Sequence, residues 1–330
     1  MLGKIIRITK SPSLPVFVLM VSFIILNIFI TRGFLTAPFI GGFFAANTPL
    51  ISIAIGVALV IISGGIDISL GAIVTMTNVL FITFINNGYS LGITIILCIF
   101  LSLVMGAVNG IIIGYLNVRP LIATFATNAI YSGIALWILP FPTGSNVPEF
   151  NDFIMWYASR PFNIPVSFMI MLVVLIIAII ALKTPVGKRI YATGNNAEKA
   201  FVSGINVNRI RLFVYTFAGG TAGIAGLALT ARIGGGNPTI GLAMTLVCIA
   251  ACVIGGINLA CGSGSVFGAV WGTIFLQLVT ATVFSLGVRT IYQNFAASVI
   301  TLIGLIIAVK LVNTKSSKRQ VLKRFRGDRS

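Results

Sequence analysis

The sequence predicts an all-α protein, a polytopic transmembrane bundle of about ten helices, and three observations support this fold class. Of its 330 residues, 58% are hydrophobic and only 8% are charged, whereas soluble domains carry about a quarter charged residues. Long stretches contain no Asp, Glu, Lys or Arg, the longest being residues 68–118 and 233–288. Stretches such as residues 166–182 are apolar on every side, which favours helices over the alternating strands of a membrane barrel.

Each span needs about 20 apolar residues, and ten stretches of suitable length follow one another. Gly64, Gly65 and Asp67 interrupt the second and third, so a broken or re-entrant helix is one interpretation there. A weak internal repeat in parallel orientation is visible, because residues 62–67 (ISGGID) resemble residues 254–258 (IGGIN), with a chance match as the alternative. The expected spans are residues 14–31, 40–62, 67–86, 89–116, 120–139, 165–182, 210–230, 239–258, 263–286 and 290–310.

Glycine spacing predicts a tightly packed bundle. Small residues four apart on a helix form a groove that lets another helix approach closely. This spacing occurs in three places. It indicates close packing of helices and does not indicate which solute, if any, the protein carries. The glycines are Gly106, Gly110 and Gly114; Gly219 and Gly223; and Gly264, Gly268 and Gly272.

The basic residues predict the orientation of the chain. The formal net charge is +17, and the basic residues flank apolar helices, as the positive-inside rule describes for cytoplasmic loops. With the N-terminus inside, cytoplasmic segments hold 18 of the 22 basic residues. We therefore expect a multi-pass protein of the inner (cytoplasmic) membrane with both termini in the cytoplasm, and no nucleic-acid partner.

Side chains for catalysis or metal binding are scarce. The chain has no His and five acidic residues, and it lacks the Gly-x-x-x-x-Gly-Lys-Ser/Thr loop that binds nucleotide phosphates. We expect its cysteines to be small buried side chains rather than metal ligands. The sequence therefore predicts no enzyme, no metal site and no cofactor bound by this chain. The four cysteines are Cys98, Cys248, Cys252 and Cys261.

Asp67 is the only acidic residue between residues 1 and 148. An acid within a membrane bundle is a functional candidate, here as a cation or proton site. The alternative is structural, because a residue just before a new apolar run can cap the next helix.

Residues 183–209 form a long basic connection on the expected cytoplasmic side. Within it, residues 197–202 (AEKAFV) are predicted to form a short amphipathic helix, with Gly204 near its C-terminal cap. Positive charge alone would hold a loop inside but would not require a capped helix. A helix lying across the surface suits docking into a groove of a partner protein.

Three ordered motifs resemble the permease subunits of ribose/xylose/arabinose/galactose-type (monosaccharide) ABC importers. They are residues 62–71 (ISGGIDISLG), 187–207 (GKRIYATGNNAEKAFVSGINV) and 254–268 (IGGINLACGSGSVFG), and the resemblance covers about residues 45–310. In one departure, this chain has Thr-Leu-Val at residues 245–247, where the family usually has Glu-Leu-Asp. The loss of both acids weakens any inference about the sugar and is compatible with a heterodimer whose other subunit keeps them.

We expect a permease domain at residues 1–312, with a cytoplasmic coupling loop at 183–209 and an extracytoplasmic loop at 140–164, then a basic cytoplasmic tail at 313–330. The resemblance implies import of a small sugar (a pentose, a hexose or a related small polar solute). It also implies ABC ATPase subunits that bind ATP and Mg, an extracytoplasmic sugar-binding protein, and a second permease copy or paralogue. The residues implied to couple to the ATPase subunits are Gly194, Asn195, Asn196, Ala197, Glu198, Ala200, Ser203 and Gly204.

The alternative class is an ion-coupled secondary transporter that uses Asp67. Such carriers tend to place several ionisable residues in the bundle, and this chain offers one. Polar side chains within the expected spans are candidates for a solute path, although interhelical hydrogen bonding is the alternative for each. The candidates are Asn47, Asp67, Thr75, Asn78, Asn109, Thr124, Asn128, Thr221 and Gln277.

Overall fold

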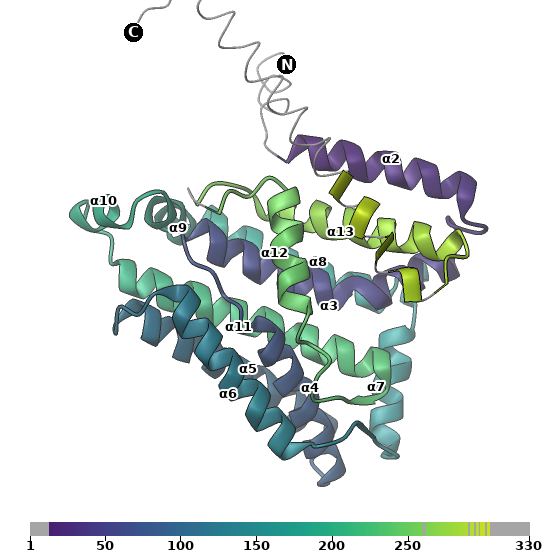
Figure 1. Ribbon diagram of the computed structural model, residues 1–330. Coiled ribbons are helices and arrows are strands. Elements are labelled where there is room, and N and C mark those ends of the chain that lie inside the picture. Colours follow the sequence, from purple (N-terminus) through teal and green to yellow (C-terminus); the bar gives the residue numbers. More distant parts are fainter. Residues whose placement is uncertain are drawn as a thin grey trace, which may run out of the picture.

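The computed structural model describes residues 13–259, 262–289, 291–293, 295–296, 298–300 and 302–303 and shows a helical bundle (Figure 1). The apolar runs form helices because a helix satisfies its backbone hydrogen bonds within the segment. The elements are α2 (Leu14–Ile30), α3 (Ala37–Ile62), α4 (Leu70–Asn86), α5 (Leu91–Gly114), α6 (Pro120–Ile138), β1 (Thr143–Gly144), α7 (Pro148–Ala158), η1 (Pro161–Asn163), α8 (Val166–Lys183), α9 (Pro185–Asn195), α10 (Ala197–Val202), α11 (Val207–Ile233), β2 (Gly235–Gly236), α12 (Met244–Ile254) and α13 (Val266–Ser285).

Six of these helices, α3, α5, α6, α8, α11 and α13, are long and apolar enough to cross a bilayer. Three shorter apolar helices, α2, α4 and α12, accompany them. The prediction of an all-α polytopic bundle is therefore confirmed, whereas the number of about ten spans is not. The tenth expected span, residues 290–310, lies largely outside the described residues, and the tail at 313–330 lies wholly outside them.

Helices α3 and α11 lie at the centre of the bundle. Every residue from 51 to 62 of α3 is buried, and α11 packs against α3, α4 and α5. Glycines allow this close packing: a Cβ on Gly106 of α5 would lie 2.9 Å from Cα of Gly219 on α11, and one on Gly110 would lie 2.7 Å from Cα of Leu212. The packing role predicted from the glycine spacing is confirmed here.

The segment at residues 234–243 is not a helix, although the sequence predicts a span at 239–258. Helix α12 begins only at Met244 and has 11 residues. It runs across α3 (Figure 1), and the segment before it passes alongside α4.

Two side chains of α4 hold the backbone of this segment. Asn78 donates from Nδ2 to the carbonyl oxygen of Gly235 at 2.8 Å, and its Oδ1 accepts from the backbone N–H of Asn237 at 2.7 Å. The hydroxyl of Thr75 accepts from the N–H of Gly241 at 3.0 Å. These bonds pair backbone groups that would otherwise need partners within a helix. Because the pairing comes from α4, the apolar pattern of the segment alone cannot show it, and the predicted span begins too early.

Helices α2 and α13 lie side by side (Figure 1) and are joined by buried polar side chains. Nδ2 of Asn27 donates to the hydroxyl of Thr282 at 2.7 Å. The hydroxyl of Thr31 lies 2.9 Å from both Asn27 Oδ1 and Ser285 Oγ. In an apolar environment such bonds fix the register of two helices.

At the end of the bundle predicted to face the cytoplasm, the connection at 183–209 contains two helices, α9 and α10. The sequence predicted α10 with its observed bounds and missed α9. Gly194 and Asn195, two of the residues implied to couple to the ATPase, form the last turn of α9. Helix α7 lies at the opposite end of the bundle (Figure 1), where β1 pairs with β2 in antiparallel register.

Candidate functional site

Helix α10 has only six residues, and both of its ends are capped. At its start, Oδ1 of Asn196 accepts from the N–H of Lys199 at 2.8 Å. At its end, the N–H of Gly204 donates to the carbonyl of Phe201 and the N–H of Ile205 to that of Ala200, which is the Schellman arrangement. A helix this short is marginal in water, so the caps help to explain why it forms.

The outer surface of α10 is apolar as well as charged. Phe201 is 70% exposed and Val202 is 83% exposed, and Glu198 and Lys199 beside them are also exposed. Ala200 is buried and anchors the helix to the bundle. Figure 1 shows α10 at the extreme end of the molecule, beyond α9. Adjacent exposed apolar side chains on a projecting helix suit contact with another protein.

The predicted coupling residues divide into a surface set and an anchoring set. Asn195, Asn196, Glu198, Ser203 and Gly204 are exposed, whereas Gly194 and Ala197 are partly buried. Phe201 and Val202 belong to the same surface, although the resemblance did not single them out. The sequence signal that could have identified them is their apolar character within a short polar connection.

Gly194, in the last turn of α9, lies between two other segments of the chain. A Cβ on Gly194 would collide with the carbonyl of Ile62, the last residue of α3, and would lie 3.1 Å from the N of Gly64. From the other side, a Cβ on Gly262 would lie 2.5 Å from the carbonyl carbon of Gly194. We call this three-way contact of Gly194, Gly64 and Gly262 the glycine junction.

The two helices that end near the junction terminate in the same way. At the end of α3, the N–H of Gly65 donates to Val60 O at 3.0 Å and Gly64 has φ +84°. At the end of α12, the N–H of Ile257 donates to Cys252 O at 3.0 Å and Gly256 has φ +81°. Both ends are Schellman caps, which need a left-handed residue and therefore favour glycine.

A side chain of α9 also reaches the loop between α12 and α13. The hydroxyl of Tyr191 donates to the carbonyl of Gly264 at 3.1 Å, and burial raises the pKa of this phenol, so it remains a hydrogen-bond donor. The three motifs that carry the family resemblance therefore meet at one place in the structure. Sequence reasoning did not predict this meeting.

The candidate path residues occupy several environments. Thr75 and Asn78 are fully buried, and their polar atoms bind residues 230–241 or the backbone of α4. Asp67, Asn109 and Thr124 come together around the connection at 63–69. The remaining four lie apart: Asn47 is buried and donates to Phe43 O, Thr221 donates to Ala218 O, and Asn128 and Gln277 are partly exposed.

Asp67 does not cap α4 directly. Its Oδ1 accepts from the N–H and the hydroxyl of Ser69, at 2.8 and 2.7 Å, and Ser69 precedes the first residue of α4. In the first turn, the N–H of Gly71 donates instead to the hydroxyl of Thr245 at 2.7 Å. Thr245, one of the positions where the family usually has an acid, is therefore buried and caps α4.

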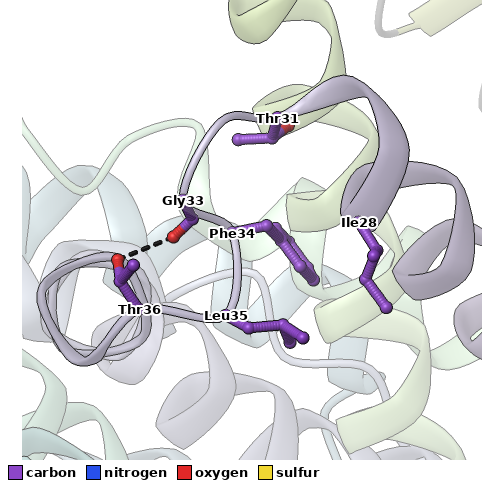
Figure 2. A pocket seen from close by; sticks show the side chains of 6 residues that line it. All are labelled: Ile28, Thr31, Gly33, Phe34, Leu35 and Thr36. Atoms are coloured by element: carbon purple, nitrogen blue, oxygen red, sulfur yellow. Dashed lines mark hydrogen bonds between the residues drawn. The ribbon is translucent and has the colours of Figure 1, made fainter.

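Two cavities in the described part of the chain lie apart from the cluster around Asp67. Figure 2 shows one of about 340 Å³ at the end of α2, beside the connection at 31–36, where the hydroxyl of Thr36 donates to Gly33 O at 2.6 Å. The other, of about 160 Å³, is lined by α5, α8 and α11, including Thr221, and its lining is apolar. Neither provides the converging polar groups that usually bind a sugar-sized ligand.

A bundle of apolar helices, six of them long enough to cross a bilayer, with a capped helix projecting from one end is the architecture of a polytopic membrane protein. The profile of the family described as "Branched-chain amino acid transport system / permease component" matches residues 39–310. The chain therefore belongs to this family of ABC-importer permeases, and the predicted membership in its monosaccharide-type group is confirmed.

Two curated relatives support this membership. The chain is 31% identical over 303 residues to the autoinducer 2 import system permease protein LsrC of Escherichia coli, covering 90% of this chain and 87% of the relative. It is 30% identical over 291 residues to the corresponding protein of Salmonella choleraesuis, covering 86% and 82%. No solved structure matches the chain.

Proposed function

We propose that this chain is the membrane-spanning subunit of an ATP-driven importer that carries a small sugar or a related small polar solute across the inner membrane. The observation that carries the proposal is the link through the glycine junction between the exposed helix α10, the end of α3 and the connection between α12 and α13. Family membership supports the ABC-importer class, and the relatives named for autoinducer 2 import support inward transport.

The partners follow from this proposal. ABC ATPase subunits dock on α10 and its flanks, residues 194–204, and hold the ATP and Mg, so this chain binds no cofactor itself. Phe201 and Val202 enter a groove on the ATPase, as exposed apolar anchors of a short helix commonly do. A second permease copy or a paralogue completes the path, and an extracytoplasmic binding protein delivers the solute at the end that holds α7.

The proposed topology has ten spans, with both termini in the cytoplasm. The ends of α3 and α12 support a parallel internal repeat, because they share the same cap geometry in the two segments whose sequences are similar. Transporters often arise by duplication of such halves.

The proposed mechanism is alternating access. ATP-driven closure of the ATPase subunits displaces α10 and α9, and the glycine junction transmits this displacement to α3 and to the connection between α12 and α13. The path lies at the interface of two permease subunits, and the predicted polar residues of the spans contribute to it. Thr75 and Asn78 act indirectly, by fixing the segment at 234–243.

The alternative class, an ion-coupled secondary transporter, is favoured by one observation: Asp67 is buried, and its Oδ2 has no hydrogen-bond partner. Family membership favours the ATP-driven class over it.

Uptake into proteoliposomes separates the two classes. The chain is reconstituted with the ATPase and binding protein encoded beside its gene, and uptake of labelled ribose, xylose, arabinose and galactose is followed. We expect uptake of at least one sugar that needs ATP and survives a protonophore. Uptake driven by a proton or sodium gradient without any ATPase would rule out the proposal.

A further inference from the structure

Among the acidic residues that the structure describes, Asp67 is unusual because it lies inside the bundle. It is 2% exposed, whereas Glu149, Asp152 and Glu198 are exposed. Its neighbour Ile66 accepts a hydrogen bond from the hydroxyl of Tyr215 at 3.3 Å. Tyr215 is the ninth residue of α11, so this point lies about 12 Å along that helix from its start.

The hydrogen bonds around Asp67 leave two buried acceptor atoms without a donor. Oδ1 of Asp67 accepts both bonds from Ser69, and Oγ of Ser69 in turn accepts from Nδ2 of Asn109 at 2.7 Å. Oδ2 of Asp67 and Oδ1 of Asn109 are buried and have no hydrogen-bond donor. The cluster of Asp67, Ser69 and Asn109 therefore lacks a donor rather than an acceptor.

Within the described part of the chain, the groups that interact with Asp67 are neutral. They are Ser69 and Asn109, together with Tyr131 from α6 and Tyr215 from α11. Arg211, which interacts with Tyr215 from the same helix, directs its Nη1 toward the carbonyl of Ile113 at 3.4 Å. An ionised carboxylate in such surroundings would carry a buried charge that only hydrogen bonds from neutral groups such as Ser69 stabilise, and burial favours the protonated form.

We propose that Asp67 is a proton-binding site, occupied in the packed state of the bundle. The carboxylate takes one proton on Oδ2 and becomes a neutral carboxylic acid, which removes the buried charge and supplies the missing donor. If the connection at 63–69 became exposed to water, the ionised carboxylate would be favoured again. Asp67 is therefore protonated only while the bundle is packed around it. This inference does not depend on the proposed transport function.

Infrared spectroscopy of the full chain in lipid tests the proposal directly. In a background carrying Asp152→Asn and Asp328→Asn, Asp67 is the only aspartate. Exposed carboxyl groups are ionised near neutral pH. We therefore expect a protonated-carboxyl band near neutral pH that shifts when aspartate is labelled with carbon-13 at its side-chain carboxyl. The band should be abolished by Asp67→Asn.

The isotope shift keeps the test decisive even where Asp67→Asn fails to fold. Absence of a shifting band in the labelled background would overturn the proposal, because Asp67 would then be ionised. Loss of the band when sodium replaces choline at constant ionic strength and pH would also overturn it, since the two free oxygens would then bind a cation. Retention of the band in both salts supports a proton.

Discussion

Gly194 and Gly262 touch through their backbones, although 68 positions separate them in the sequence. A Cβ on Gly262 would lie 2.6 Å from Cα of Gly194, closer than side-chain atoms approach a backbone. Gly194 also touches the end of α3, at Ile62 and Gly64. A rigid displacement of α9 therefore acts on two places in the bundle at once.

The first prediction concerns this contact. Gly194→Ala should lower the free energy of unfolding by about 1–3 kcal/mol, because the added methyl group overpacks against backbone atoms. It should also uncouple transport, since α9 must shift away from the end of α3, at Ile62 and Gly64, while α10 keeps its own caps. ATPase binding measured by co-purification should persist, whereas uptake per ATP hydrolysed should fall several-fold.

The matched control is Gly133→Ala on α6. A Cβ on Gly133 meets no atom within 4 Å, so we expect unchanged coupling and a stability gain of about 0.5–1 kcal/mol from the better helix former. Normal coupling in Gly194→Ala would show that the glycine junction does not transmit the displacement.

The second prediction concerns Asn78, whose amide binds Thr230, Gly235 and Asn237. Asn78→Leu should lower the free energy of unfolding by about 1–3 kcal/mol for each buried partner left unpaired. Thermal unfolding in detergent measures this, with Asn128→Leu on the partly exposed face of α6 as the control. Equal melting temperatures for the two variants would contradict the assigned role of Asn78.

The third prediction concerns the bond between Asn27 of α2 and Thr282 of α13. A double-mutant cycle with Asn27→Ala and Thr282→Ala should give a coupling energy of about 0.6–2 kcal/mol, the range found for hydrogen bonds between membrane helices. Additive effects of the two substitutions would show that the bond does not hold α2 against α13.

Sequence reasoning recovered the features that depend on local pattern. Apolar runs gave most of the helices, and the turn chemistry at Asn196 and Gly204 gave α10 with its observed bounds. Glycine spacing predicted close helix packing, and the structure shows it between Gly106 of α5 and Gly219 of α11. In each case the sequence pattern that carried the prediction spans only a few positions.

Features that depend on distant residues were missed. Residues 239–243 were expected within a span, yet the hydroxyl of Thr75 of α4 accepts a hydrogen bond from the N–H of Gly241, and α12 begins only at Met244. The meeting of the three motifs at Gly194 depends equally on contacts between residues far apart in the sequence. A single sequence contains no local signal for contacts between residues so far apart.

If α10 is the docking surface for an ATPase, a substitution on its exposed face should reduce the amount of ATPase subunit that co-purifies with the chain. Phe201→Glu replaces a side chain that is 70% exposed on α10, and Phe162→Glu replaces one that is 93% exposed at the opposite end of the bundle. Burial of a Phe side chain contributes about 1.5–3 kcal/mol, so Phe201→Glu should weaken ATPase binding about tenfold or more, while Phe162→Glu should bind as the unmodified chain does. Equal recovery of the ATPase with Phe201→Glu and with the unmodified chain would contradict docking of the ATPase on α10.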